Sequence, residues 1–282
     1  MNYIFYIFVA PMHIRVRNLI LILLAVLSFS ACSDYEKVTK SKDVNYKLTK
    51  ANEYYDKKQY QHANAIYEGL IPVMAHTRNA EPLYYRYAYS FYYMKDYLSA
   101  SYHFKNFVDM YPNSKDADEC EYMYGVSLYK LSPKHTLDQT NTEKAQEALQ
   151  SYINTHPNSK RAEEANAYVM DCLGKLEEKD ADAAKLYYKI GQYKAATVAF
   201  KSVMRNYPES HNGDLYQLMV VKANYKYAQE SVKEKQEERY SNAVSSYQEM
   251  VDNYPKSKYL PEAEKYYTLA DNNIKKIRNE HK

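Results

Sequence analysis

The stretch that decides the fold runs from Leu83 to Pro112 and reads LYYRYAYSFYYMKDYLSASYHFKNFVDMYP. Its apolar and aromatic residues recur every three or four positions, first from Tyr84 onward and again from Tyr97 onward. This spacing places them on one face of each of two amphipathic helices. Pro112 stops the second helix, because proline lacks a backbone N–H and its ring clashes with a preceding helical turn. The stretch therefore predicts a helix, a tight turn, and a second helix that ends before Pro112.

The same arrangement recurs along the chain, with a Tyr/His-Pro-x-Ser tetrapeptide at the end of four segments. Consecutive prolines of this tetrapeptide are 45, 51 and 47 residues apart, and an alanine lies 12 residues before each of them. The prolines are Pro112, Pro157, Pro208 and Pro255, and the alanines are Ala100, Ala145, Ala196 and Ala243, with Ala63 at the equivalent place in a first copy without the proline. A small residue lets two helices approach closely, and the serine can cap the helix that follows. A repeat of this length predicts stacked helix pairs.

The composition excludes several classes of function. The 282 residues include five glycines, no tryptophan and 35 tyrosines, so glycine-rich phosphate loops and glycine-dependent hairpins have little support. The net charge is +3, of which Arg15 and Arg17 contribute +2, so the chain from Cys32 onward is nearly neutral and we expect no binding of nucleic acid. The histidines are scattered and no nucleophile motif or carboxylate pair stands out. We therefore expect no catalytic residue, no enzyme, no cofactor and no bound metal.

The N-terminal segment predicts export. From Met12 the chain reads MHIRVRNLILILLAVLSFSAC, a short basic region followed by an apolar run that is about half the ~20 residues of a membrane span. We interpret residues 1–31 as a signal peptide, with Met12 as an alternative start of the chain. One long anchor from Tyr3 to Phe29 is the other interpretation.

The residues Phe29-Ser30-Ala31-Cys32 resemble the lipobox of bacterial lipoproteins, with Phe29 where leucine is usual. The resemblance implies that Cys32 becomes the mature N-terminus and carries acyl chains that anchor it to a membrane. An ordinary cleavage site with Cys32 merely nearby is the alternative. The polar residues that follow predict a lipidated flexible tether over 32–44.

The helix pairs resemble tetratricopeptide (TPR) repeats. The best match is 83–112, and 177–208 also matches well. The resemblance implies an all-α protein, a right-handed α-solenoid of about five TPR-like helix pairs. We expect repeats 1–3 over 45–158, and repeats 4–5 with a terminal capping helix over 159–282. Insertions are expected near 131–142 and 230–238, and a single long or kinked helix over 159–190, which contains no proline.

The two cysteines of the repeats are expected to be free. In the aligned repeats, Cys120 lies near the start of its helix and Cys172 lies two turns further along the neighbouring one. The offset along the helix axes is ~10 Å, whereas a disulfide requires Cα atoms within ~7 Å. We expect two buried thiols.

Clustered tyrosines are the candidate binding residues. On the helix over 84–93, the core face takes Tyr84, Tyr87 and Phe91, which leaves the other tyrosines for a groove or for solvent. Tyrosine offers apolar area and a hydroxyl at a small entropic cost, which suits peptide binding. The candidates are Tyr54, Tyr55, Tyr85, Tyr89, Tyr92 and Tyr93. The alternative is that they cover the helical core with their hydroxyls in water.

The chain from Cys32 resembles the BamD family, lipoproteins of the outer-membrane β-barrel assembly machine. The resemblance rests on the lipobox, the length, the five repeats, and the segment LYYKIGQYKAA at 186–196 with Asn206-Tyr-Pro-Glu-Ser after it. It implies a lipid-anchored scaffold of the outer membrane that faces the periplasm. It also implies two partners, the periplasmic domains of a BamA-like β-barrel insertase at the C-terminal repeats and unfolded outer-membrane protein segments at the N-terminal repeats. The alternatives are another envelope TPR protein of the Tol–Pal-associated type, and a surface lipoprotein that binds glycans.

Overall fold

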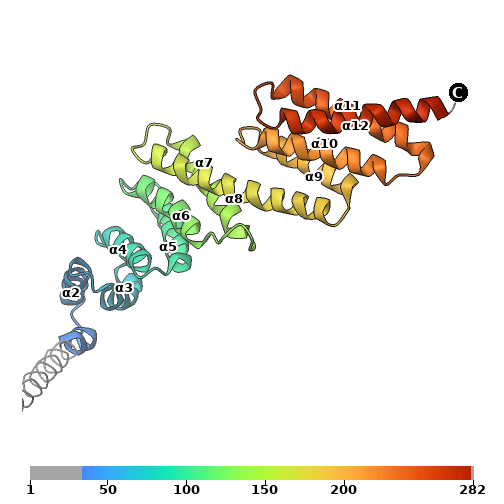
Figure 1. The fold of residues 1–282 in the computed structure, drawn as a ribbon. Helices are drawn as coiled ribbons and strands as arrows, with labels where there is room; N and C mark the ends of the chain where they lie inside the picture. The colour runs from blue at the N-terminus through green and yellow to red at the C-terminus, as the bar shows by residue number, and fades with distance from the viewer. Residues whose placement is uncertain (1–33, 281–282) are drawn as a thin grey trace, which may run out of the picture. The chain divides into compact units, whose positions relative to one another are not determined.

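The computed structural model describes residues 34–280, and over this range the chain consists of helices joined by turns and loops, without a strand (Figure 1). A short helical segment over 34–40 precedes the labelled helices. The helices are α2 (Val44–Asp56), α3 (Tyr60–Met74), α4 (Ala80–Tyr93), α5 (Tyr97–Met110), α6 (Ala117–Leu131), α7 (Thr140–Thr155), α8 (Ala162–Lys189), α9 (Tyr193–Asn206), α10 (Gly213–Gln229), α11 (Lys233–Asn253) and α12 (Leu260–Glu280). In sequence order they form five helix pairs, with α12 as a final single helix. The predicted all-α, TPR-like architecture is confirmed.

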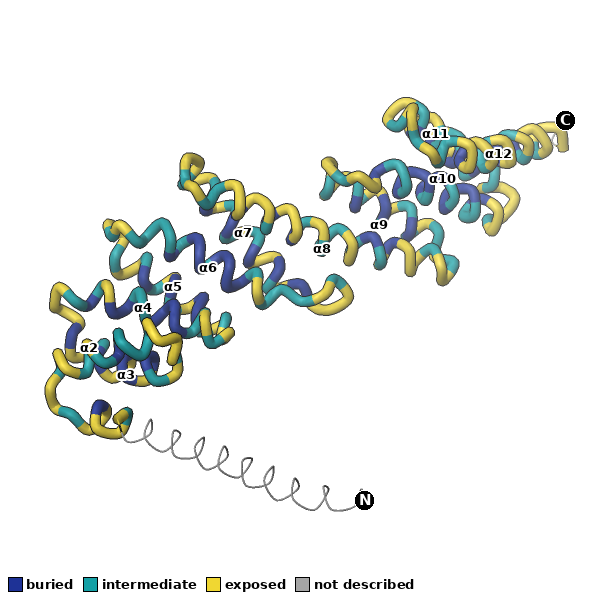
Figure 2. The backbone as a smooth tube through the Cα atoms, turned by 60° about the vertical axis from the view of Figure 1, so that its left-hand side comes forward, coloured by how far each residue is buried: buried dark blue, intermediate teal, exposed yellow. Residues whose placement is uncertain are grey.

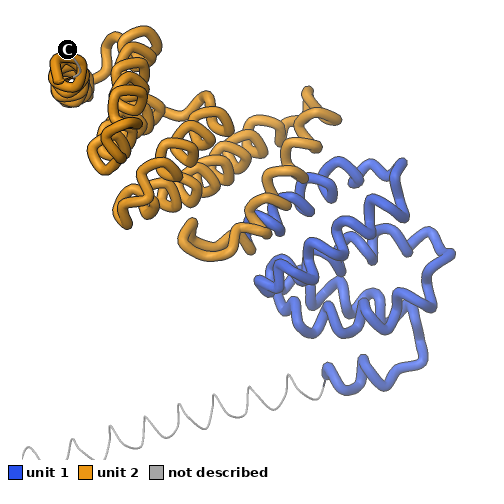
Figure 3. Tube along the Cα trace, turned by 90° about the vertical axis from the view of Figure 1, so that its right-hand side faces the viewer, with its two compact units in different colours: residues 1–130 blue, residues 131–282 orange. Residues whose placement is uncertain are grey.

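The described part of the chain forms two compact units, which divide between Lys130 and Leu131 (Figure 3). In the first unit α2 packs on α3, α3 on α4 and α4 on α5; in the second, each helix from α7 to α12 packs on the next. Buried residues lie on the helix faces that meet within each unit, and exposed ones gather at the turns and outer faces (Figure 2). The units divide within the third repeat, at the start of the 132–139 loop, whereas our division by repeats placed the boundary after residue 158.

The alanines at the repeated position are fully buried: Ala63, Ala100, Ala145, Ala196 and Ala243 each have 0% exposure. Helices α5, α7, α9 and α11 end two residues before their prolines, at Met110, Thr155, Asn206 and Asn253. The residue between helix and proline leaves helical geometry, as the ring of a following proline requires. For example, Tyr111 has φ −128° and ψ 57°. The proline spacing therefore sets the helix ends.

Each Tyr/His-Pro-x-Ser corner is closed by its serine. The hydroxyl oxygen accepts a hydrogen bond from the backbone N–H two residues later, just before the next helix begins, at Ser114, Ser159, Ser210 and Ser257. In three corners the hydroxyl also donates to a carboxylate on the helix that starts the preceding pair. These bonds are Ser114–Glu81 (2.5 Å), Ser210–Glu177 (2.6 Å) and Ser257–Asp214 (2.7 Å). The corner thus joins the start of one pair to the first helix of the pair before it.

The turn inside three helix pairs holds one residue in the left-handed region. Lys58 (φ 60°), Lys95 (φ 64°) and Gly191 (φ 78°) occupy the same place, immediately before the residue that precedes the second helix. Only glycine adopts this conformation without a steric cost from Cβ. The two lysines therefore strain their turns, and Gly191 does not.

The start of the described chain differs from our prediction of a flexible tether over 32–44. Residues 34–40 are helical, and Val38 is 1% exposed within the core formed by α2, α3 and α4. Tyr35 and Val38 are three residues apart, so they share one helical face that packs on the first repeat. Cys32 and the predicted signal peptide over 1–31 lie outside the described residues.

The two insertions and the long helix take distinct forms. Residues 132–139 form a loop, while the charged insertion mainly lengthens α11 to 21 residues. Helix α8 spans 28 residues without interruption and ends just before Gly191. Cys120 and Cys172 are both free and buried.

Candidate functional site

A line of tyrosine rings runs along α4 and across to α2 and α3 in the first unit. Tyr85, Tyr89 and Tyr93 are spaced four residues apart, with ring centroids separated by 4.8 Å and then 5.7 Å. The ring of Tyr93 stacks on Tyr60 at 4.6 Å, and Tyr60 meets the edge of Tyr55 at 5.4 Å. We call these five residues the tyrosine row. Four of them are candidates from the sequence; Tyr60 is not, because it stands alone at the start of α3, outside the clustered tyrosines that mark the candidates.

The tyrosine row passes from the interior to the surface. Tyr89 is 8% exposed, packs edge-on against Phe104 at 4.9 Å, and donates its hydroxyl to Glu119 Oε1 at 2.9 Å. Tyr93 is 46% exposed. Our prediction that Tyr89 faces a groove or solvent therefore does not describe its position, because Glu119 of α6 and Phe104 of α5 enclose it. The accessible part of the row is its Tyr55–Tyr60–Tyr93 end.

Two other candidates lie beside the row rather than in it. Tyr92 contacts Tyr93 at 5.9 Å and Tyr97 at 5.5 Å, so it extends the exposed end toward α5. Tyr54 belongs to a separate group with Tyr35 and His62, at 6.0 Å and 5.3 Å. The structure thus gathers five of the six candidates and separates Tyr54.

An arginine lies against the accessible end of the row. The guanidinium of Arg86 sits 5.1 Å from the centroid of the Tyr55 ring and pairs with Asp56 at 2.9 Å. Burial lowers the pKa of Arg86, but nearby Tyr67 and Asp56 outweigh it, so the guanidinium stays charged. Burial also raises the pKa of Tyr55, and raises that of Tyr67 to about 12. The hydroxyls therefore remain protonated donors at neutral pH.

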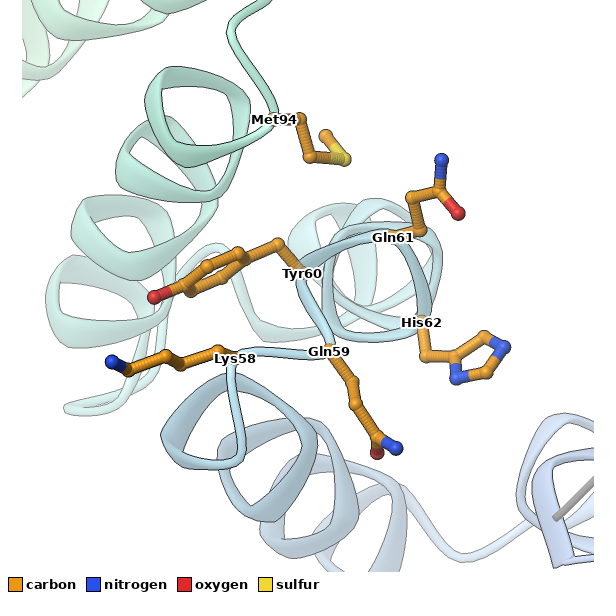
Figure 4. A pocket seen from close by; sticks show the side chains of 6 residues that line it. All are labelled: Lys58, Gln59, Tyr60, Gln61, His62 and Met94. Carbon is orange, nitrogen blue, oxygen red and sulfur yellow. The ribbon is translucent and has the colours of Figure 1, made fainter. Parts of the chain in front are cut away.

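A shallow hollow of about 340 Å³ opens beside this end, at the start of α3 (Figure 4). Its lining is Lys58, Gln59, Tyr60, Gln61, His62 and Met94. In Figure 4, Lys58 and Tyr60 project side by side, while His62 points away from them. The lining combines a tyrosine ring, a histidine ring, a lysine cation, two amides and a methionine. Such a surface can hold an apolar side chain and hydrogen-bond the peptide backbone beside it.

A second hollow of about 330 Å³ lies at the opposite ends of the same helices and is more apolar. Its lining includes Ile71, Met74, Leu83, Tyr84 and Met110, from α3, α4 and α5. No tyrosine of the row contributes to it. The sequence offered no signal for it, because these residues fit the core pattern equally well.

The second unit exposes apolar side chains at the end of α8. Three of them lie just before the Gly191 turn: Leu186 and Tyr187 in the last turn of the helix, and Ile190 at its C-cap. Leu186 and Ile190 are four residues apart and lie on one helical face. We call these three residues the α8 ridge. It falls within the LYYKIGQYKAA segment that the sequence had singled out.

Among residues 34–280, no group of three histidine, cysteine, aspartate or glutamate side chains is placed to hold a metal ion. Within the same range, none of the helices has both the length and the apolarity that a membrane crossing requires. The architecture offers shallow hollows and exposed faces, which suit protein contacts better than catalysis.

Comparison with solved structures returns TPR proteins. They include TTC0263, a thermophilic TPR protein of Thermus thermophilus (13% identity, 81% of this chain and 98% of that one, TM-score 0.33), and the TPR2AB domain of yeast Sti1 in a pHSP90 complex (13%, 81% and 98%, 0.37). YrrB, described as a TPR protein with an unusual peptide-binding site, is 18% identical over 82% of this chain and 96% of its own, with a TM-score of 0.34. Comparison with curated proteins gives no match.

One family model covers most of the chain. The model for YfiO, described as an outer membrane lipoprotein, matches residues 39–238 and, in a second overlapping match, residues 174–277. Together the two matches take in all five helix pairs and most of α12. The chain therefore belongs to the YfiO (BamD) family of outer membrane lipoproteins.

Proposed function

We propose that this protein is a scaffold for the assembly and insertion of β-barrel proteins into the outer membrane. The observation that carries the proposal is the family match across 39–277, which takes in both compact units. The helix pairs support it, since they offer exposed faces rather than an enclosed reaction site. In this proposal acyl chains on Cys32 hold the protein to the outer membrane, and the repeats face the periplasm.

The first unit binds unfolded client segments at the accessible end of the tyrosine row. Strands of membrane β-barrels alternate apolar and polar residues, and side chains on one face of an extended strand recur about every 7 Å. The rings of Tyr55, Tyr60 and Tyr93 lie 5.4 Å, 4.6 Å and 6.2 Å from one another, which is closer than that interval, so together they form one compact aromatic surface. One apolar side chain of a client can therefore rest on this surface at a time.

The second unit holds the BamA-like insertase through the α8 ridge. Its exposed leucine, tyrosine and isoleucine are the kind of residues that a partner covers, because an isolated helix face of this kind gains by burial. Binding the client at one unit and the insertase at the other brings the two together on one chain.

Affinity purification of the full-length chain from detergent-solubilised outer membranes tests the proposal. The insertase should co-purify with the wild type and with a control variant, Leu98→Glu, which alters an exposed leucine of α5 in the first unit. The variant Leu186→Glu with Ile190→Glu should retain less than about a tenth of it, because two charges would have to be desolvated at the contact. Depletion of the protein should lower many barrel proteins together. Purification without the insertase, or unchanged barrel levels, would contradict the proposal.

A further inference from the structure

The helical segment over 34–40 begins very close to the predicted site of lipid attachment. It starts two residues after Cys32 and is held to the first repeat by buried Val38. Two residues of fully extended chain span at most about 7 Å. If Cys32 bears acyl chains, the helical segment and the first repeat that it packs against must therefore lie close to the bilayer surface.

An aromatic group surrounds this starting point. The ring of Tyr35 stacks on His62 at a centroid distance of 4.3 Å and an interplanar angle of 27°, and meets the edge of Tyr54 at 6.0 Å. Tyr46 is 40% exposed and lies eight residues before Tyr54 on α2, within the same helical stripe. We call Tyr35, Tyr46, Tyr54 and His62 the N-terminal aromatic patch.

Lysines accompany the patch. Residues 34–50 contain five lysines and three acidic residues, a net charge of +2. Lys37, Lys40 and Lys42 are exposed, and Lys37 and Lys40 form surface ion pairs with Asp34 (3.6 Å) and Glu36 (2.5 Å) that lipid phosphates can replace. Tyrosine and lysine are characteristic of the membrane–water interface, where the ring enters the headgroup layer and the cation meets lipid phosphates. The aromatic and the charged residues thus point to the same kind of surface.

We propose that the N-terminal aromatic patch rests in the headgroup layer of the bilayer that carries the acylated Cys32, so that the first repeat lies on the membrane rather than hanging from it. The proposal rests on the lipid anchor of the proposed function. It also explains why Tyr54 stands apart from the tyrosine row, since its neighbours are the residues nearest the anchor.

The absence of tryptophan from the chain allows a direct test. Tyr46→Trp places a single indole in the patch, and Tyr102→Trp places one on α5, where Tyr102 is 63% exposed and outside the patch. Each acylated full-length variant is reconstituted into vesicles of phosphatidylethanolamine and phosphatidylglycerol with brominated acyl chains. The Tyr46→Trp variant should emit at shorter wavelength and lose at least about half of its intensity, because bromine quenches only at close range, while the Tyr102→Trp variant should keep its intensity.

The outcomes separate this inference from the anchor itself. Mass spectrometry of the N-terminal peptide reports acylation of Cys32 independently of the fluorescence. Acylated protein with equal, unquenched emission from both variants would overturn the patch and leave the anchor intact. Protein without acyl chains would overturn both. Replacing Lys37 and Lys40 with glutamate should reduce the quenching of the Tyr46→Trp variant in these anionic vesicles; unchanged quenching would contradict the part assigned to the lysines.

Discussion

The hydroxyl of Ser210 donates a 2.6 Å hydrogen bond to Oε1 of Glu177, and so ties the corner after α9 to the middle of α8. The same carboxylate oxygen accepts from the Tyr216 hydroxyl at 2.7 Å and from the Asn212 side chain at 3.2 Å. Three donors from the next pair thus meet on one half-buried carboxylate. These hydrogen bonds hold the start of α10 and the corner before it against α8, in addition to the apolar core.

Replacing Glu177 with alanine should lower the free energy of unfolding by about 1–3 kcal/mol, because three donors lose their shared acceptor. Urea unfolding followed by circular dichroism measures the loss. Glu209→Ala is the matched control, since Glu209 is exposed in the same corner, and it should change stability by less than about 0.5 kcal/mol. Equal effects of the two variants would show that the carboxylate does not hold the corner.

The stabilisation that Glu177 contributes should be lost at acidic pH. Burial acts to raise the pKa of Glu177, but hydrogen bonds from Ser210, Tyr216 and Asn212 outweigh it and hold the pKa below its ordinary value of 4.5. The stabilisation is therefore complete above pH 4.5 and is lost as the pH falls through the lower pKa of the folded state. The difference in unfolding free energy between wild type and Glu177→Gln should shrink over that acidic interval. A difference that stays constant as the pH falls would contradict the assignment.

The left-handed turn residues predict opposite effects of two substitutions. Lys95→Gly should raise the free energy of unfolding by about 0.5–1 kcal/mol, because glycine adopts a φ of 64° without a clash from Cβ. Gly191→Ala should lower it by about 1 kcal/mol, and the cost comes from backbone conformation, because no atom beyond the adjacent residues lies within 4 Å of the added Cβ.

Lys57→Gly is the control for the turns, since Lys57 has φ −81° and gains nothing from glycine. It should leave stability unchanged or slightly lower. Thermal unfolding of the three variants in parallel gives the comparison. Stabilisation by Lys57→Gly equal to that by Lys95→Gly would mean that left-handed strain is not the cause.

The buried alanines should not tolerate a larger side chain. Ala100→Leu and Ala196→Leu should each cost about 1–3 kcal/mol, since both alanines have 0% exposure and leucine would push two helices apart. Ala183→Leu, on the exposed face of α8, should have little effect. Normal unfolding free energies for both core variants would show that the helices at these crossings can move apart freely.

The tyrosine row predicts which side chains bind a client. Tyr60→Ala and Tyr93→Ala should each weaken binding of a labelled peptide from a barrel strand by roughly tenfold, which corresponds to the loss of one well-placed aromatic contact. Tyr102→Ala removes an exposed ring outside the row and should leave affinity unchanged. Fluorescence anisotropy measures binding, and circular dichroism verifies that each variant is folded. Equal affinities for all three variants would place client binding elsewhere on the chain.

Much of the fold followed from local signals. The three-and-four spacing from Tyr84 predicted both helices of the second pair, and Pro112 predicted where the second ends. The single helix α8 follows from a stretch without proline that ends just before Gly191. These features depend on residues close in sequence, where helix geometry alone relates position to face.

The site was less predictable because its neighbours are distant in sequence. Tyr89 shares a helical face with Tyr85, yet Glu119, which lies 30 residues further along the chain, helps to bury it and accepts its hydrogen bond. Tyr54 looked equivalent to Tyr55, but the stacking of Tyr35 on His62 assigns it to another group. The composition of 34–40 is polar, yet Val38 is buried in the core of the first repeat and Tyr35 packs against that core.

The serine corners define which pieces of this chain can be exchanged. Glu81 and Ser114 are 33 residues apart, and so are Glu177 and Ser210, so each bond closes a segment of 34 residues. A chimera joined at the proline would take the carboxylate and the serine from different parents. The hydrogen bond between them would then no longer be guaranteed, and the carboxylate could lose its donor. Recombination that moves α8 through α10 as one piece keeps Glu177 together with Ser210, Asn212 and Tyr216, and so transfers the closure intact.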